Sequence, residues 1–333
     1  MNINGRRAGI TGVGVCVPER IVTNVDLESL VDTNDQWIRE RTGIAERRFV
    51  YPEQATSDLA VVAGERALVA AGVDPEQVDL IIVATNTPDM LFPATACLVQ
   101  DRLGASRAGA FDLLAGCTGF VYALTVGAQF VVSGAYKTVL VIGSEVISKI
   151  LDFEDRNTCV LFGDGAGAAV LQSVPGDRGI LAARLGSDGS GGLFIHQPGG
   201  GSRIPASHES LEQRLHYLKM NGREVFKFAV RVVGKVAAEV LDDAGLKQEE
   251  LDFFIPHQAN IRIIEVAAKR LGLPMDRVLV NVDRYGNTST ASVPLALNEA
   301  LEQGRIKDGD NVVMVGFGTG LTWAAVAMKW YSP

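Results

Sequence analysis

One cysteine of this chain stands where a nucleophile would be activated. Cys117 lies in LLAGCTGFVYAL (113–124), in which an apolar strand and a turn of small residues precede a helix expected to begin near Thr118. The unpaired N–H groups and the positive dipole end of such a helix favour a thiolate, which is the reactive form of cysteine. Gly116 and Gly119 leave room for a substrate carbonyl beside the sulfur. We therefore expect Cys117 to be a nucleophile rather than a small residue filling a crowded helix start.

The other three cysteines show no pattern of a metal site. Cys16, Cys97 and Cys159 are far apart in the sequence, and no CxxC pair occurs. Isolated cysteines of this kind are usually small buried hydrophobic residues. The sequence thus predicts no metal and no redox pair.

A histidine and an asparagine mark a second chemical region. Of the four histidines, His257 alone follows an apolar strand, in FFIPHQANIRII (253–264), and α/β proteins place their sites at strand ends. Asn287 lies in YGNTSTAS (285–292), just before the expected start of another helix. A structural core histidine and a helix-capping asparagine are the alternatives for these two residues.

The three side chains together indicate acyl chemistry on a thioester. A thiolate accepts an acyl group from a thioester with little change in bond energy. His257 and Asn287 would supply two neutral hydrogen bonds to a thioester oxygen while an enolate forms by decarboxylation. The residues alone leave open a cysteine hydrolase, in which histidine would be the base for the thiol.

The elements that must position these residues follow an α/β pattern. Apolar runs of strand length alternate with longer amphipathic segments, at LIIVAT (80–85), TVLVIG (138–143), DFFIPH (252–257) and NVVMVG (311–316). Strands this apolar are covered on both faces, as in α/β proteins.

An internal repeat relates the two halves of the chain. AGVDPEQVDLIIVATN (71–86) aligns without gaps with AGLKQEELDFFIPHQA (244–259). With one gap, FDLLAGCTG aligns with VNVDRYGNTS, which sets Cys117 opposite Asn287. We infer an N-terminal half that carries Cys117 and a C-terminal half that carries His257 and Asn287, spanning 1–175 and 176–333.

Composition and charge exclude several classes of protein. The 333 residues include 31 Lys and Arg against 39 Asp and Glu, for a net charge of −8, so a basic nucleic-acid binder is not expected. No apolar run is expected to approach the ~18 to 20 residues of a membrane span. The N-terminal residues fit a strand and turn better than a secretory signal. We expect a soluble, cytoplasmic protein.

Six segments in a fixed order distinguish the chain: DTNDQWIRERTGI (32–44), AGCTGF (115–120), DFEDRNTCVLFGDGAGA (152–168), NGREVFKFAV (221–230), PHQANIRII (256–264) and YGNTSTAS (285–292). This ordered set resembles the β-ketoacyl-acyl carrier protein synthase III family of the thiolase superfamily, nearly end to end. The resemblance implies a thiolase-like fold, with two pseudo-symmetric α/β halves in a layered α-β-α-β-α arrangement.

The resemblance also implies roles for the candidate residues. The acyl-accepting cysteine of the family matches Cys117, and its decarboxylating pair matches His257 and Asn287. The backbone N–H of Thr319 matches the group that joins the N–H of Cys117 in the oxyanion hole. Related enzymes often have glycine at the Thr319 position, which a backbone role tolerates.

Substrate and partner sites are implied in the same way. Residues that grip the nucleotide end of coenzyme A match Trp37, Arg41 and Arg156, and tryptophan and arginine suit adenine and phosphate. A basic docking patch for acyl carrier protein matches Lys227, Arg262, Lys269 and Arg270. The last three share one helical face by their spacing, although such faces are often simply solvated. Phe92 matches a residue that closes the acyl pocket of a partner subunit, so a homodimer is implied.

The implied reaction is a decarboxylative condensation that initiates type II fatty acid biosynthesis. An acyl group moves from acyl-CoA to Cys117, and malonyl-acyl carrier protein then loses carbon dioxide and attacks it, with no cofactor. The alternative within the superfamily is a specialised starter-unit ketosynthase or acyltransferase of a polyketide or quinolone pathway. A non-catalytic acyl-CoA-binding protein would not need Cys117.

Overall fold

Two mixed β-sheets form the framework of residues 5–332, which the computed structural model describes. The first sheet has the strand order β1–β7–β6–β4–β5 and the second the order β11–β12–β13–β8. The strands are β1 (Arg7–Cys16), β4 (Leu80–Ala84), β5 (Gly109–Leu113), β6 (Val139–Glu145), β7 (Gly165–Val174), β8 (Gly179–Ser187), β11 (Phe253–Pro256), β12 (Asn311–Gly318) and β13 (Thr322–Lys329). The four apolar runs predicted as strands are confirmed as β4, β6, β11 and β12.

The two sheets repeat one pattern of pairing. In the first, β4 pairs parallel with β5 and β6, and β7 pairs antiparallel with β6 and β1. In the second, β11 pairs parallel with β12, and β13 pairs antiparallel with β12 and β8. A parallel bridge from Phe254 to Val278 takes the place that β5 has beside β4. The expected pseudo-symmetry is thus present, while the division of the chain at 175/176, in the turn after β7, stays a prediction.

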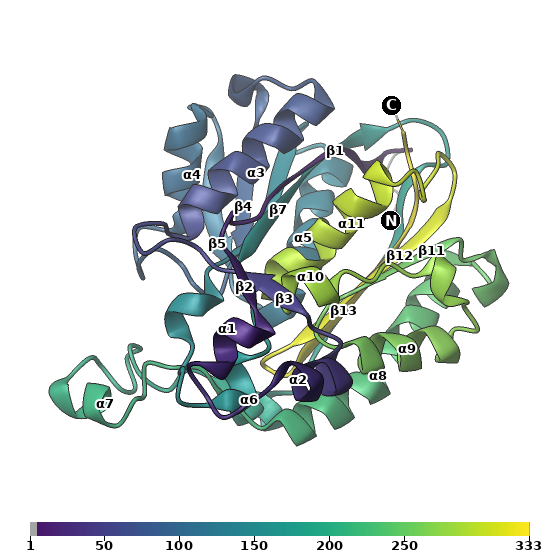
Figure 1. Cartoon of the computed structure of the whole chain (residues 1–333). Helices are drawn as coiled ribbons and strands as arrows, with labels where there is room; N and C mark the ends of the chain where they lie inside the picture. The colour runs from purple at the N-terminus through teal and green to yellow at the C-terminus, as the bar shows by residue number, and fades with distance from the viewer. Residues whose placement is uncertain (1–4, 333) are drawn as a thin grey trace.

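Helices complete five layers (Figure 1). Two helices cover the outer face of the first sheet, two cover the outer face of the second, and two lie between the sheets. In that order the pairs are α3 (Thr56–Ala71) and α4 (Thr95–Leu103), α8 (Gly222–Ala244) and α9 (Ile261–Arg270), and α5 (Gly119–Ser133) and α11 (Ser292–Glu302). The predicted α-β-α-β-α layering is confirmed.

Alternate residues of a strand pack into different layers, because strand side chains point to opposite faces. In β4, Ile81 and Val83 belong to the outer core with α3, whereas Leu80, Ile82 and Ala84 belong to the central core with α5. All five residues are buried. A strand covered on both faces must be apolar throughout, which explains the uninterrupted runs in the sequence.

The central helix corrects one expectation from the sequence. Gly116–Ser133 is long and apolar enough, by length and composition, to cross a membrane, so the expectation that no run approaches this length was wrong. However, 67% of the segment is buried in the structure. It lies between the sheets, in contact with strands of both, and this is the position of a core helix.

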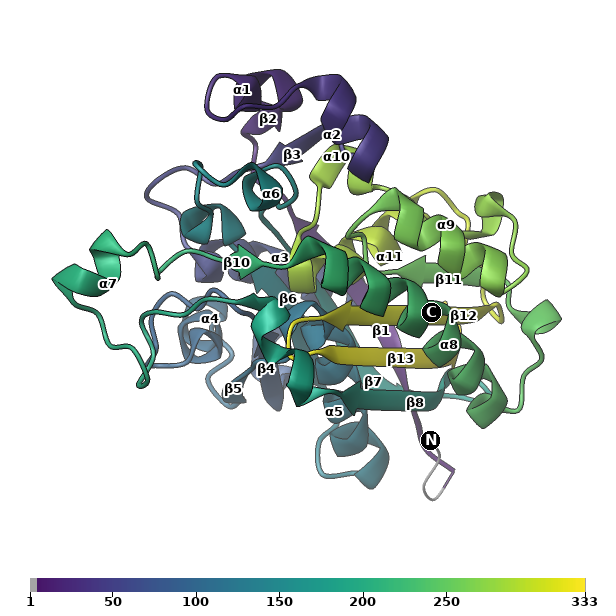
Figure 2. The same cartoon turned by 90° about the horizontal axis from the view of Figure 1, so that it is seen from below.

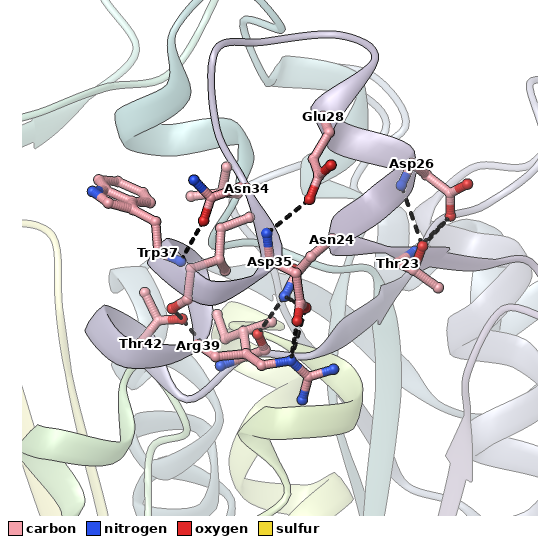
Figure 3. Close-up of polar contacts among 12 residues, drawn as sticks. Thr23, Asn24, Asp26, Glu28, Asn34, Asp35, Trp37, Arg39 and Thr42 are labelled. Carbon is pink, nitrogen blue, oxygen red and sulfur yellow. Dashed lines mark hydrogen bonds and ion pairs between the residues drawn. The ribbon is translucent and has the colours of Figure 1, made fainter.

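An N-terminal excursion sits over one end of the layers. It consists of β2 (Ile21–Thr23), α1 (Asn24–Glu28), α2 (Asp35–Thr42) and β3 (Glu46–Arg48). Asn34 caps α2 by accepting a hydrogen bond from the N–H of Trp37 at 2.8 Å, and Asp35 accepts from Asn24 Nδ2 at 2.8 Å. Figure 3 shows these contacts, with the ring of Trp37 directed away from them. The capped helix fixes where Trp37 stands.

Short elements complete the described chain. They are α6 (Arg156–Cys159), β9 (Ile195–His196), α7 (His208–Glu212), β10 (Lys219–Met220) and α10 (Val282–Tyr285). Seen from below, α7 lies on an excursion well away from the sheets (Figure 2). β9 and β10 pair with each other and contribute to the cavity described next.

Candidate active site

A cavity of about 1020 Å³ is lined by residues of both halves. Its wall contains Cys117 from the first half and His257 and Asn287 from the second. Phe317 and Thr319, at the end of β12, complete this part of the wall. The structure therefore brings together the three side chains that the sequence singles out.

Cys117 lies in a 3₁₀ turn, Gly116–Thr118, that leads directly into α5. The predicted strand-to-helix elbow is confirmed. Burial raises the pKa of the Cys117 thiol to about 12, and the nearby Glu145 carboxylate acts in the same direction. A hydrogen bond from Ser289 opposes them only in part. Desolvation thus opposes the thiolate that the helix start is expected to favour.

The backbone around Cys117 is pressed against the end of β12. Gly116 has a φ of +62°, and a Cβ at that position would lie 2.9 Å from Thr319 N. A Cβ on Gly318 would lie 2.6 Å from Cys117 N. Both positions therefore require glycine, and this close approach sets the backbone of Cys117 beside that of Thr319. The Thr319 side chain turns aside and donates to Ile195 O at 2.5 Å.

His257 follows β11 and is fixed on two sides. Its Nδ1 lies 2.5 Å from Ser292 Oγ at the start of α11, and its ring meets Phe317 edge to face at 5.0 Å between centroids. The residue is 1% exposed, and burial lowers the pKa of His257 to about 3. The imidazole is therefore neutral at physiological pH, so it acts as a hydrogen-bonding group rather than a cation.

Asn287 has its amide oriented by the backbone. Its Oδ1 accepts from the N–H of Ser289 at 2.9 Å, which leaves Nδ2 for the cavity side. Within residues 5–332, neither Asn287 Nδ2 nor His257 Nε2 has a hydrogen-bond acceptor. The predicted repeat match is loose, since Asn287 lies five residues before α11 and Cys117 only two before α5.

The residues proposed to hold a nucleotide lie together at the cavity. Trp37 and Arg41, both from α2, line its wall. The guanidinium carbons of Arg41 and Arg156 lie 4.9 and 5.1 Å from the centre of the Trp37 ring. Arg156 also donates to Asp32 O at 2.7 Å. The structure groups all three residues and leaves their role as a prediction.

The proposed docking residues are exposed and spread over two helices. Lys269 and Arg262 lie on the exposed side of α9, and the Arg262 guanidinium donates to Glu40 O. Arg270 instead leans over α8, where it donates to Arg231 O at 3.3 Å. Lys227 of α8 is exposed and pairs with Glu224 at 2.6 Å. The predicted shared face of α9 is exposed, although its two arginines bend toward different neighbours.

Phe92 lies outside the cavity of its own chain. It sits in the loop between β4 and α4, with 84% of its surface exposed. Met90 and Leu91 beside it are also exposed. This apolar loop is available for contact with another molecule, as the predicted pocket-closing role requires.

Several residues of the site escaped sequence reasoning. Ser289 touches Cys117, Ser292 touches His257, and Glu145 ends β6 beneath the site. His196 also lines the cavity, and within the described chain its Nδ1 is buried without a hydrogen-bond partner. In the sequence, these residues could have been found only as a serine two residues after Asn287 and a glutamate at the end of an apolar strand. Neither residue type marks catalysis without its neighbours.

The three remaining cysteines are free and differ in burial. Among residues 5–332, no cluster of three or more His, Cys, Asp or Glu could hold a metal ion. Cys159 is buried as predicted, whereas Cys97 is exposed, so the prediction of burial was wrong for Cys97. Cys97 lies on the exposed side of the amphipathic helix α4. The spacing between cysteines, on which the prediction rested, does not show which side of a helix a residue occupies.

Known proteins resemble the chain over nearly its full length. Residues 111–189 match the family 3-oxoacyl-[acyl-carrier-protein (ACP)] synthase III, and residues 241–330 match its C-terminal family. The beta-ketoacyl-[acyl-carrier-protein] synthase III of Caldanaerobacter subterraneus is 58% identical over 97% of this chain and 98% of that protein. The synthase III of Symbiobacterium thermophilum is 57% identical over 98% of each chain. The chain belongs to the β-ketoacyl-[acyl-carrier-protein] synthase III family.

Solved structures agree with this membership. A synthase III from Thermus thermophilus is 51% identical, covers 98% of this chain and 100% of its own, and superposes with a TM-score of 0.91. The priming β-ketosynthase of the R1128 polyketide pathway is 38% identical, covers 100% and 99%, and has a TM-score of 0.90. As a synthase III, the protein has the thiolase-like fold and is an acyl-condensing transferase of fatty acid biosynthesis.

Proposed function

We propose that the protein condenses an acyl-CoA starter with malonyl-acyl carrier protein through an acyl-Cys117 intermediate. The observation that supports this most is one cavity that presents a thiol and two neutral donor groups from opposite halves. A thiol accepts the acyl group, and neutral donors stabilise the enolate oxygen that decarboxylation produces. The first product of such an enzyme is a 3-ketoacyl-carrier protein.

In the first half-reaction, Cys117 Sγ attacks the thioester carbonyl and coenzyme A leaves. The backbone N–H groups of Cys117 and Thr319 would hold the carbonyl oxygen as it becomes negative. Their support is the close packing enforced at Gly116 and Gly318. Preorganised backbone donors of this kind need no rearrangement as charge develops.

In the second half-reaction, His257 and Asn287 would hold the malonyl thioester oxygen while carbon dioxide leaves. Ser292 Oγ accepts from Gln258 N–H at 3.4 Å and would donate its own hydroxyl hydrogen to Nδ1 of His257. The imidazole proton would then reside on Nε2, on the side of the ring away from Ser292. With Asn287 Nδ2, this gives two donors and no net charge. The resulting enolate attacks the acyl carbonyl, and Cys117 Sγ leaves.

The two substrates would reach the cavity by the same mouth. Trp37, Arg41 and Arg156 would bind the nucleotide end of coenzyme A, with the ring stacking on adenine and the guanidinium groups near phosphate. The acidic carrier protein would dock on the exposed cations Lys227, Arg262, Lys269 and Arg270 of α8 and α9. These four cations form a local basic surface on a chain whose net charge is −8. A basic surface is complementary to an acidic carrier protein, and this complementarity supports the proposal.

We further propose a cytoplasmic homodimer that needs no cofactor. The exposed Phe92 would enter the acyl pocket of the second subunit, where its ring would limit the length of the starter. Desolvation of so apolar a loop favours association. The similarity to a priming β-ketosynthase of a polyketide pathway keeps a specialised starter-unit role as the second candidate.

The proposal is tested by the mass of the protein after incubation with a panel of acyl-CoA donors. One acyl group is expected on the peptide that contains Cys117, and none in Cys117→Ala. Addition of malonyl-carrier protein should then clear the acyl group as 3-ketoacyl product. Labelling at another residue, or hydrolysis of the acyl group before malonyl thioester arrives, would contradict the assignment.

A further inference from the structure

A buried hydroxyl and a buried carboxylate lie in line beneath the nucleophile. Ser289 Oγ is 3.3 Å from Cys117 Sγ and 3.0 Å from Glu145 Oε1. Asn86 Nδ2 donates to the same Ser289 oxygen at 3.1 Å. The chain thiol–hydroxyl–carboxylate is therefore continuous, and each contact is within hydrogen-bonding distance for its atoms.

Counting donors gives this chain a direction. The hydroxyl of Ser289 has one hydrogen, which can go either to the sulfur or to the carboxylate, not to both. An ionised carboxylate is the stronger acceptor. When Ser289 donates to Cys117 Sγ, it stabilises a thiolate; when its hydrogen goes to Glu145, the thiol hydrogen of Cys117 is left to bind Ser289 Oγ. The arrangement is then S–H to O–H to carboxylate, ready to pass one proton.

The surroundings of Glu145 are polar and neutral. The residue ends β6 with none of its surface exposed. Its carboxylate accepts from Thr87 Oγ1 at 2.7 Å and from Asn86 Nδ2 at 2.5 Å, and Thr290 Oγ1 lies at 3.2 Å. Its other contacts are Asn86 N–H and the hydroxyl of Thr85. Within the described chain, the titratable group that faces it is the Cys117 thiol. Burial raises the pKa of Glu145, so this carboxylate is a better proton acceptor than an exposed one.

The backbone of Ser289 is held in an unusual conformation at this point. Its φ is +50°, a left-handed value that costs a non-glycine residue free energy. The side chain of Asn287 accepts its N–H at 2.9 Å and so fixes the turn. Strain of this kind persists where the surrounding structure imposes it, and here it aims the hydroxyl at Cys117.

We propose that Ser289 and Glu145 form a proton relay that takes the proton of Cys117 when the sulfur attacks an acyl thioester. The proton passes from Sγ to Ser289 Oγ, while the hydroxyl proton of Ser289 passes to Glu145 Oε1. The Sγ–carbon bond forms, and the bond from the carbonyl carbon to the leaving sulfur breaks. The leaving thiolate keeps the electron pair and takes the proton back through Ser289, so Glu145 becomes ionised again.

The relay explains how a buried thiol can react as a nucleophile although burial opposes its ionisation. A thiol with a pKa of about 12 holds a negligible thiolate fraction at neutral pH, and removing its proton to water would leave two negative charges side by side. Transfer to Glu145 keeps one negative charge in the site before and after. Ser289 is the catalytic residue of the relay, since it touches the reacting sulfur. Glu145 acts through Ser289 as a positioning and proton-holding residue.

Relay and simple electrostatics predict opposite effects of Glu145→Gln. The glutamine side chain keeps the shape but can take no proton. If Glu145 acts only by its charge, the substitution lowers the pKa of Cys117 and speeds its reactions at neutral pH. If Glu145 receives the proton, the substitution slows them by about 100-fold, as loss of a general base does.

The test measures alkylation of Cys117 by iodoacetamide in the full-length protein, with peptide mass spectrometry to separate Cys117 from the other cysteines. In the wild type, the internal proton transfer makes the rate independent of pH over the range in which Glu145 is ionised and Cys117 is a thiol. In Glu145→Gln and Ser289→Ala, the rate at pH 7 falls, and it rises by about tenfold per pH unit because only free thiolate reacts.

A matched control is Thr125→Val, which removes a hydroxyl of α5 whose hydrogen bond goes to Val121 O rather than to Glu145 or Cys117. It should keep the pH-independent profile. Thermal unfolding of each variant shows whether it is folded, and the slope against pH separates the relay from a structural effect, which would lower all rates in parallel. A faster Glu145→Gln, or a slope equal to that of the wild type, would overturn the proposal.

The relay proposal depends on the proposed function in one respect only, which is that the acyl group comes from acyl-CoA. Acylation by acetyl-CoA is measured beside alkylation in the same variants. If wild-type Cys117 shows the pH-independent alkylation but takes no acyl group, the proposed function fails and the relay stands. If acylation occurs in Glu145→Gln at the wild-type rate, the relay fails and the function stands.

Discussion

The two halves use the same strand end for opposite purposes. The fifth residue of VIGSE, at the end of β6, is Glu145, and that of the matching MVGFG, at the end of β12, is Gly318. Glu145 places a buried carboxylate beneath the site, whereas Gly318 lets the Cys117 backbone come close. The end of this strand thus carries a carboxylate in the first half and, in the second half, a glycine that leaves room for a neighbouring backbone. The difference shows how a repeated fold acquires an asymmetric site without changing its architecture.

The side chains carried by each half differ in the same sense. The first half holds titratable groups, the Cys117 thiol and the Glu145 carboxylate. The second half holds neutral donors, since His257 has a pKa of about 3 and Asn287 carries no charge. We infer that the groups that give up and accept the thiol proton belong to the first half, with Ser289 of the second half between them, and that the second half stabilises the enolate.

The largest expected effect removes the space at Gly318. In Gly318→Ala, the added Cβ would lie 2.6 Å from Cys117 N and force the two backbones apart. Because a displacement of about 1 Å at a reacting group can cost 100-fold in rate, we expect acylation to fall by about 100-fold. Acyl transfer followed by protein mass measures this. Gly189→Ala, where a Cβ meets nothing within 4 Å, is the control, and equal rates in both variants would refute the need for close approach.

A smaller effect is expected from Ser292→Ala, which tests the neutral hydrogen-bond donors of the second half. Loss of the hydroxyl leaves Nδ1 of His257 without its partner and frees the imidazole to take either tautomer. We expect decarboxylation to slow by about tenfold, the worth of one hydrogen bond, with acylation unchanged. Release of carbon dioxide from malonyl-carrier protein reports the first rate and protein mass the second. Equal slowing of both steps would show that Ser292 serves the structure as a whole.

A weaker effect on the rate should follow from Arg41→Ala in α2, at the wall of the cavity. Loss of one guanidinium beside Trp37 should raise the KM for acyl-CoA roughly fivefold and leave kcat unchanged. Arg39→Ala is a matched control on the same helix, since Arg39 pairs with Asp35 rather than with Trp37. A KM that rises equally in the two variants would mean that α2, rather than Arg41, has been disturbed.

The last effect concerns stability rather than rate, because the buried His257 is neutral when folded. Its pKa falls from 6.5 to about 3 on folding, so the unfolded chain binds a proton more readily between these values. The free energy of unfolding should therefore decrease as pH falls through this window, by up to about 1.4 kcal/mol per pH unit from this group. In His257→Gln the slope should be shallower over the same range. Identical urea-unfolding slopes would show that another group dominates.

Much of the fold could be predicted from the sequence because it depends on strong apolar periodicity. The strands β4, β6, β11 and β12 are apolar on both faces, and burial on both faces requires that pattern. The position of Cys117 before α5 follows from local sequence for the same reason. The repeat also predicted that Cys117 and Asn287 lie together, although the helices that it aligns begin at different distances after them.

The state of the site could not be predicted in the same way. Whether Cys117 is a thiolate depends on how completely other elements bury it, and Ser289 reaches it from 172 residues away along the chain. Ser292 and Glu145 gain meaning only from distances to His257 and Ser289. Local sequence gives propensity, whereas the pKa of a buried group depends on packing between segments that are remote in sequence.

The most direct test of the division between the halves is the fate of Cys117 in His257→Ala. Peptide mass spectrometry follows the protein first with acyl-CoA and then with malonyl-carrier protein. We expect acyl-Cys117 to form at the wild-type rate and then to persist, because decarboxylation falls by about 100-fold or more without the donor. Failure of Cys117 to become acylated in this variant would contradict the account, since it would make His257 the base for the thiol.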